Sequence, residues 1–191
     1  MDSSPVSRRT LLGAAGAALL AHGAKQRVRG ANDRINVGCI GLGGRGSHLM
    51  QMTLKRQEMR GDVQVVAVCD VYRNRLDAAT EAAKGAKPYL HHPELLDRRD
   101  IDAVLVATPD HWHAPITLMA MEKGKDVYCE KPMTHTLAEA KKVYHRSKEL
   151  NRVVQVGVQA IGVVKQILDG PVSALTQAAN VKRRLGHQPR S

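Results

Sequence analysis

The sequence predicts an α/β fold in which a doubly wound parallel sheet carries helices on both faces. Two observations support this fold class. Between residues 33 and 159, short apolar strands alternate with helical segments of about ten to fifteen residues, which is the rhythm of parallel βαβ units. The strands are also apolar along their whole length, as expected where both faces of a sheet are covered. Residues 33–159 therefore form the predicted domain.

The first half of this domain begins with an apolar strand at 35–40. A glycine-rich turn at 41–46 follows it, and a helix is expected at 47–59. The second strand, 64–69, is rich in Val and apolar throughout, as a buried strand should be. The helix expected at 74–84 ends because a glycine follows it.

The second half repeats the alternation. After a weak third strand we expect a short helix at 90–96, and then strand, helix, strand, helix and strand at 102–107, 114–123, 126–129, 136–150 and 153–157. Gly124 ends the helix before it, and Thr136 with Glu139 predicts a capping box at the start of the longest helix. Right-handed crossovers between these strands place the loop after each strand at one edge of the sheet. The unusual residues gather in those loops, so this edge is the predicted binding site.

Composition excludes several classes of protein. Hydrophobic residues make up 43% of the 191 residues, which argues against disordered and fibrous chains. Aromatic residues make up only 3%, which leaves few stacking platforms for single-stranded nucleic acid. Cys39, Cys69 and Cys129 form no C-x-x-C pair, so we interpret them as small buried hydrophobes. The net charge of +11 suits a phosphate-bearing ligand, and weak nonspecific binding to polyanions is the alternative.

The first 24 residues predict a twin-arginine export signal. The motif S-R-R-T-L-L stands at residues 7–12, and an apolar run of small residues continues to Ala21. That run is too short to span a bilayer, which needs about 20 residues, and it fits the hydrophobic region of a signal. We therefore expect a periplasmic or otherwise exported protein with no membrane segment in its mature form.

The glycine-rich turn matches the pattern G-x-G-x-x-G and lies between a strand and a helix, as a dinucleotide-binding turn does. Its glycines allow a tight turn, close approach to a pyrophosphate and close packing of helix on strand. Asp70 ends the second strand, where its carboxylate can accept hydrogen bonds from the adenosine ribose and favour NAD. Arg73 and Arg75 follow it; they could bind the 2′-phosphate of NADP or be solvated charges at the start of a helix.

Two further loops resemble one family. They are T-P-D-H-W-H at 108–113 and E-K-P at 130–132. Together with the glycine turn they make residues 33–159 similar to the nucleotide-binding domain of the Gfo/Idh/MocA oxidoreductases, a Rossmann-like NAD(P)-binding domain. The resemblance implies a hydride transfer between a nicotinamide and a secondary alcohol of a sugar, polyol or glycoside. Members of the family are usually homo-oligomers. We expect no specific nucleic-acid partner.

The resemblance assigns roles to individual residues. Those implied to bind the cofactor are Gly41, Gly43, Gly44, Arg45 and Gly46 at the pyrophosphate, Asp70 at the adenosine ribose, Thr108, Pro109 and His113 on the nicotinamide side, and Glu130 and Lys131 at the nicotinamide ribose. Lys131 is also the implied catalytic residue, because a cation there can hold the substrate hydroxyl and stabilise developing negative charge. We expect no metal, since the H-x-H at 111–113 has no third ligand at suitable spacing.

The chain differs from the family after the last strand. Members continue into a second α/β domain that supplies most substrate contacts and the general base, whereas we expect residues 160–191 to be a truncated remnant or a disordered basic tail. The short chain is therefore expected to be weakly active or inactive. Two alternatives stay open, namely an NAD-dependent glycosidase of the same superfamily and a nucleotide-binding remnant without catalysis.

Overall fold

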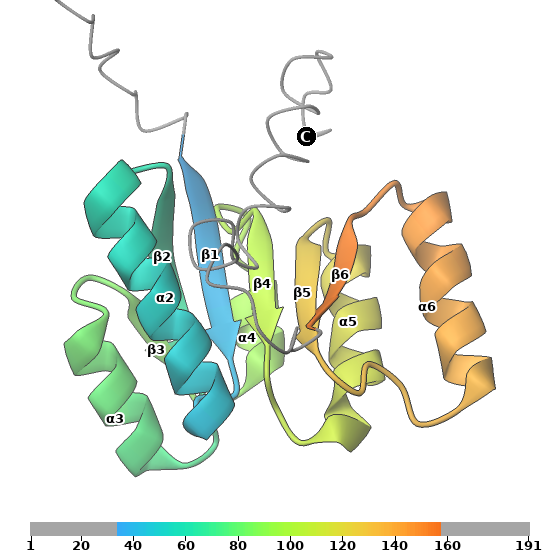
Figure 1. The fold of residues 1–191 in the computed structure, drawn as a ribbon, viewed down its shortest axis with the longest axis horizontal. Coiled ribbons are helices and arrows are strands. Elements are labelled where there is room, and N and C mark those ends of the chain that lie inside the picture. Colours follow the sequence, from blue (N-terminus) through green and yellow to red (C-terminus); the bar gives the residue numbers. More distant parts are fainter. Residues whose placement is uncertain (1–33, 158–191) are drawn as a thin grey trace, which may run out of the picture.

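A computed structural model describes residues 34–157 of the chain, so the predicted export signal and the segment 160–191 lie outside the described residues. The described part is a six-stranded, wholly parallel sheet with the strand order β3-β2-β1-β4-β5-β6 (Figure 1). The strands are β1 (Ile35–Ile40), β2 (Val63–Cys69), β3 (Lys87–Tyr89), β4 (Ala103–Val106), β5 (Asp126–Glu130) and β6 (Val154–Gly157). This order confirms the predicted doubly wound sheet, with its switch point between β1 and β4.

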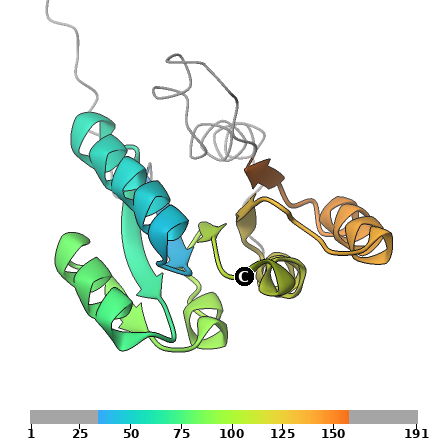
Figure 2. The ribbon, with the colours of Figure 1, turned by 60° about the horizontal axis from the view of Figure 1, so that its bottom comes forward.

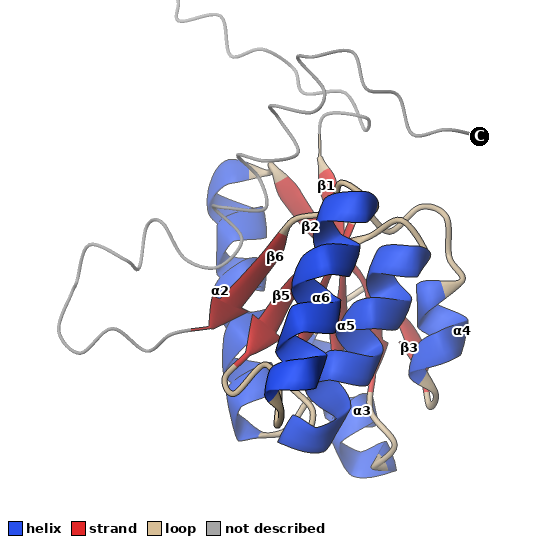
Figure 3. Cartoon of the chain, turned by 90° about the vertical axis from the view of Figure 1, so that its right-hand side faces the viewer, coloured by secondary structure: helices blue, strands red, loops and turns tan. Residues whose placement is uncertain are grey.

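Helices cover both faces of the sheet. They are α2 (Gly44–Arg60), α3 (Arg73–Ala82), α4 (His92–Leu96), α5 (His113–Glu122) and α6 (Leu137–Glu149), with a single 3₁₀ turn, η2 (Asp110–Trp112), before α5. In the view along the edge of the sheet, α2 lies on one side and α4, α5 and α6 lie on the other (Figure 3). Helices α5 and α6 pack beside each other on that second face (Figure 2).

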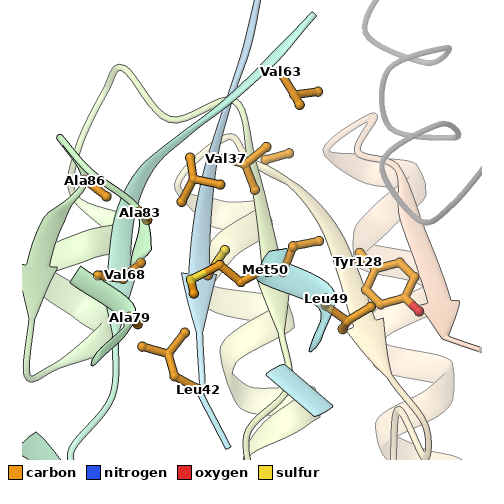
Figure 4. Packing of buried hydrophobic residues seen from close by; sticks show 14 of the residues in the cluster. Val37, Leu42, Leu49, Met50, Val63, Val68, Ala79, Ala83, Ala86 and Tyr128 are labelled. Carbon is orange, nitrogen blue, oxygen red and sulfur yellow. The ribbon is translucent and has the colours of Figure 1, made fainter. Parts of the chain in front are cut away.

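Each face has its own aliphatic core. Under α2 and α3, strand residues such as Val37 and Val68 pack against Leu49 and Met50 of α2, and Tyr128 of β5 closes this core (Figure 4). The core on the opposite face is built around α5 and β4. The three cysteines are buried in these strands, and burial raises the pKa of Cys39 to about 12 and that of Cys129 to about 11. They are therefore unreactive core side chains, as the sequence predicts.

Most predicted elements are present within one or two residues, and one boundary differs more. Helix α2 begins at Gly44 rather than at residue 47, so the last three residues of the glycine motif form its first turn. The capping box of α6 is confirmed, because Thr136 Oγ1 accepts from the Glu139 N–H and Glu139 accepts from the Thr136 N–H. Among residues 34–157, no helix is long and apolar enough to cross a membrane.

Candidate functional site

The glycine turn lies at the edge where the strands end, hereafter the carboxyl edge. Gly41 has a φ of 83°, and a Cβ there would lie 2.6 Å from the Thr108 amide nitrogen. A Cβ at Gly46 would overlap the carbonyl oxygen of Gly41. Both glycines are therefore required by the fold itself, because the turn, helix α2 and the loop after β4 press against one another at these points.

Gly43 and Gly44 have a different role, because space is open around them. A Cβ at Gly44 would meet nothing within 4 Å, and a Cβ at Gly43 would meet only the Arg75 guanidinium, at 3.5 Å. No side chain caps the amino-terminal end of α2. The first N–H groups of a helix have no partner within it and favour an anion. This end of α2 is thus an open cradle of N–H groups that fits a phosphate.

Asp70 is buried at the end of β2 and fixes two backbone segments. Its Oδ2 accepts from the Leu42 N–H at 2.7 Å, and its Oδ1 accepts from the Tyr72 N–H at 2.8 Å. The carboxylate therefore holds the glycine turn against the start of the next loop, a role that the motif does not reveal. A carboxylate has about four lone-pair sites, so Asp70 retains acceptor capacity for ribose hydroxyls.

Beside Asp70 lies a cavity of about 570 Å³, within the usual range for a small-molecule site. One wall is Tyr72 with the Arg75 guanidinium 5.5 Å from its ring centroid. Its lining also includes His92 and Trp112, whose ring centroids are 5.8 Å apart. The cavity is continuous with the glycine turn, since Gly41 and Gly43 also line it. Its lining is mostly apolar.

The loop after β4 supplies the middle of the site. Thr108 and Pro109 line the cavity, and Thr108 Oγ1 is a buried oxygen with no hydrogen-bond partner among the described residues. Such an atom is costly to leave unpaired and marks a place where a bound group completes the hydrogen bonding. His113, in contrast, is only 2% exposed and lies beneath the loop rather than on its surface.

Glu130 is the centre of a buried network at the end of β5. Its Oε1 accepts from Arg45 Nε at 2.7 Å and from the Tyr128 hydroxyl at 3.2 Å, while its Oε2 accepts from the Lys131 N–H at 3.2 Å. Burial, and then the neighbouring Glu130 carboxylate, raise the pKa of Tyr128 to about 12, so its hydroxyl remains a donor. Arg45 is thus held by Glu130 at the start of α2, with its side chain still 38% exposed.

Sequence reasoning missed Tyr128 and Gly157 in this network. A Cβ at Gly157 would lie 2.5 Å from the Tyr128 hydroxyl and 2.9 Å from Glu130 Cδ, so the last residue of β6 must be glycine to leave room. One signal was present, because Tyr128 stands two residues before Glu130 and side chains two apart on a strand share a face. Nothing in the local sequence indicates the contribution of Gly157.

Lys131 follows Glu130 and is exposed, and its peptide bond to Pro132 is cis. The predicted site residues therefore lie along one carboxyl edge: the glycine turn and Asp70 at β1 and β2, Thr108 and Pro109 at β4, and Glu130 and Lys131 at β5. Among residues 34–157 no group of three or more His, Cys, Asp and Glu side chains could hold a metal ion. Within the H-x-H, His111 is exposed while His113 is buried, so the two rings do not share a site.

Comparison with known proteins gives concordant results. The model of an oxidoreductase family with an NAD-binding Rossmann fold, GFO_IDH_MocA, matches residues 35–158. A glycosyl hydrolase family 109 protein of Saccharopolyspora erythraea is 34% identical over 184 residues, covering 78% of this chain and 38% of its own length. An inositol 2-dehydrogenase of Rubrobacter xylanophilus is 33% identical over 155 residues, covering 77% of this chain and 43% of its own length.

Solved structures agree. The myo-inositol 2-dehydrogenase of Lactobacillus plantarum has a TM-score of 0.60 at 26% identity, covering 65% of this chain and 36% of that one. A levoglucosan dehydrogenase in complex with NADH and levoglucosan has a TM-score of 0.59 at 28% identity, covering 64% and 34%. The chain thus spans about two fifths of the length of these curated relatives. The family match over residues 35–158 and the geometry of the carboxyl edge together establish that this chain belongs to the Gfo/Idh/MocA oxidoreductases and carries their NAD-binding Rossmann domain.

Proposed function

We propose that the carboxyl edge binds NAD in one extended pose and serves a hydride transfer between its nicotinamide and a secondary alcohol of a sugar, polyol or glycoside. One observation carries the proposal: the open amino-terminal end of α2, the cavity beside Asp70 and the exposed Lys131 follow one another along a single edge. The similarity to inositol 2-dehydrogenases supports the substrate class.

In this proposal each segment of the edge has one task. The N–H groups at the start of α2 bind the pyrophosphate, Asp70 accepts from the adenosine ribose, and Thr108 supplies its unpaired hydroxyl on the nicotinamide side. NAD, when bound, supplies the hydride acceptor. Lys131 holds the substrate hydroxyl and stabilises the negative charge that develops on its oxygen as its proton leaves. The family resemblance assigns the general base to a second domain, and we assign none among residues 34–157.

NADP is the alternative cofactor. Arg75 lines the cavity next to Gly43, where it can pair with a phosphate, whereas the buried carboxylate of Asp70 disfavours a 2′-phosphate by charge repulsion. We propose NAD as the preferred cofactor because Asp70 is fixed by two backbone N–H groups and cannot turn away.

A second reaction uses the same domain. The similarity to glycosyl hydrolase family 109 proteins favours an NAD-dependent glycosidase as the alternative function. Net production of NADH from a free polyol indicates the dehydrogenase, and cleavage of a glycoside without net NADH indicates the hydrolase. A nucleotide-binding chain without catalysis would show binding and neither reaction. We further propose export by the twin-arginine route, on the motif at residues 7–12.

Thermal unfolding of the whole chain with NAD, with NADP and without ligand tests the proposal. A ligand that binds only the folded state raises the melting temperature, and NAD is expected to raise it more than NADP. The matched variants are Gly43→Asp and Gly43→Asn. Both residues are good N-caps and fit the space at Gly43, where φ is −64°, so both variants should fold. Both side chains compete with the pyrophosphate for the N–H groups of α2, and the aspartate also repels it, so NAD affinity should fall in both variants and further, by roughly hundredfold, in Gly43→Asp.

The two variants make the test specific. If both variants bind NAD as tightly as the unmodified chain, the phosphates do not lie at the start of α2 and the proposed pose is wrong. If the unmodified chain unfolds cooperatively and neither NAD nor NADP raises its melting temperature, the cofactor proposal itself fails.

A further inference from the structure

The ring of His113 lies between the two loops that end β4 and β5. Its Nε2 is 2.8 Å from the carbonyl oxygen of Thr108, and its Nδ1 is 2.7 Å from the carbonyl oxygen of Pro132. The side chain is almost fully buried. Thr108 lines the cavity and Pro132 directly follows Lys131, so one ring touches the backbone on both sides of the nicotinamide half of the edge.

The chemistry of the contacts is constrained because both partners are carbonyl oxygens, which only accept hydrogen bonds. Each ring nitrogen faces one of these carbonyl oxygens, and a ring N–H is the group that can donate to such an oxygen. With both ring nitrogens facing backbone carbonyls, the ring has no polar atom left for a ligand. His113 can therefore influence a bound cofactor only through the loops it joins.

We propose that His113 is a positioning residue that sets the spacing between Thr108 and Lys131 and so shapes the nicotinamide half of the site. The inference rests on the proposed binding of NAD along this edge. It replaces the expected direct contact of His113 with the nicotinamide by an indirect one. Strands β4 and β5 are paired neighbours, so backbone hydrogen bonds fix the distance between them. Beyond the last of these bonds, the His113 ring fixes the distance between the two loops that follow the strands.

A second contact joins the same loops but is of a different kind. His135 Nε2 lies 3.2 Å from Asp110 Oδ2, and both side chains are about half exposed. Exposed ion pairs are weak and are screened by salt, so this pair cannot substitute for the buried ring. Of these two contacts, we therefore assign the alignment of Lys131 to the buried His113 ring alone.

The test compares the affinity of the whole chain for NADH with that for ADP, which lacks both the nicotinamide and its ribose. His113→Asn places an amide nitrogen near the position of Nδ1 and keeps the donor toward Pro132. His113→Gln places one near Nε2 and keeps the donor toward Thr108. His113→Phe fills the space and keeps neither. We expect the affinity for NADH to fall about tenfold in each amide variant and further in His113→Phe, because a lost buried hydrogen bond releases one loop. The affinity for ADP should stay within about twofold.

Met121→Ala is the control for a merely structural role. Met121 is buried on the same helix and touches neither loop bond, so its loss should lower the melting temperature without changing the ratio of the two affinities.

The outcomes separate the two proposals. Equal losses of NADH and ADP affinity in the His113 variants, or no loss, overturn the positioning role while leaving NAD binding intact. If the unmodified chain binds neither ligand, the proposed function fails first and the inference fails with it.

Discussion

The two halves of the carboxyl edge are built in different ways. The half at β1 and β2 is made of backbone: glycines that leave space, open N–H groups at the start of α2, and one carboxylate bound to two N–H groups. The half at β4 and β5 is made of side chains that reach one another across the fold, with Glu130 joined to Arg45 and Tyr128. The difference teaches that the first half depends on shape, whereas the second depends on paired polar groups.

The Arg45–Glu130 pair spans the two halves, since Arg45 is in the first turn of α2 and Glu130 ends β5. The residues are 85 positions apart in the chain. A charged side chain in the first turn of α2 is thereby held in place by the half at β4 and β5. Because of this contact, we expect a substitution in one half to affect the other half. The variants described below measure the size of that effect.

The largest expected effect is on the backbone half. Gly46→Ala adds a Cβ that overlaps the Gly41 carbonyl, so the turn or the helix must move, at an expected cost of about 4 kcal/mol or more in the free energy of unfolding. Gly44→Ala is the control, since its Cβ meets nothing, and it should stabilise the chain by roughly 0.5–1 kcal/mol. Chemical denaturation of both variants checks this pair, and equal stabilities would contradict the close approach at Gly46.

A smaller effect is expected in the side-chain half. Glu130→Gln removes the carboxylate that Arg45 and Tyr128 share, but Arg45 can reach water, so the expected loss is about 1–3 kcal/mol. Tyr128→Phe removes a single donor and should cost about 1 kcal/mol. Denaturant unfolding of the two variants and of their combination measures the coupling. Strictly additive losses would show that the two side chains do not act as one network.

The same network predicts a pH dependence. The pKa of Tyr128 is raised from 10.0 to about 12 in the folded chain, because burial and Glu130 favour the neutral phenol. The stabilisation is therefore complete below the unfolded pKa and is lost as pH rises from about 10 to about 12. Tyrosinate absorbance should show a late-titrating tyrosine that is missing in Tyr128→Phe. If all four tyrosines titrate together in the folded chain, Tyr128 is not held as described.

The smallest effect is expected at the surface of the side-chain half. His135→Gln removes the exposed partner of Asp110, and the melting temperature should change by an amount that is barely measurable and vanishes at high salt. Melting curves at low and high salt check this. A clear loss of stability at high salt would mean that the pair, and not His113 alone, joins the two loops.

Sequence reasoning predicted the backbone half almost completely. The glycine spacing, the flanking strands and Asp70 follow from local requirements, because a tight turn, an N–H cradle and a strand-end acid are each encoded within a few residues. Even in this half, the start of one helix was predicted too far along the chain. Helix α2 begins at Gly44, because the last glycines of the motif adopt helical conformation and present their N–H groups from its first turn.

The side-chain half was predicted only as a set of residues. E-K-P at residues 130–132 identified the location, but the partners of Glu130 come from α2 and from its own strand, with Gly157 of β6 leaving the space. His113 was expected to line the site, yet its ring is buried between two carbonyl groups. Contacts between residues far apart in the chain leave no periodic pattern, so motif reasoning does not find them.

By itself the sequence determined the alternation of strands and helices, the parallel sheet, the buried cysteines and the glycine turn, because burial patterns and turn chemistry act over short stretches of chain. Only the tertiary structure decided that Asp70 binds the turn, that Glu130 joins Arg45 to Tyr128 and that His113 faces inward. The physical reason is that a buried polar group must find a partner, and which partner it finds depends on how the strands and helices pack together.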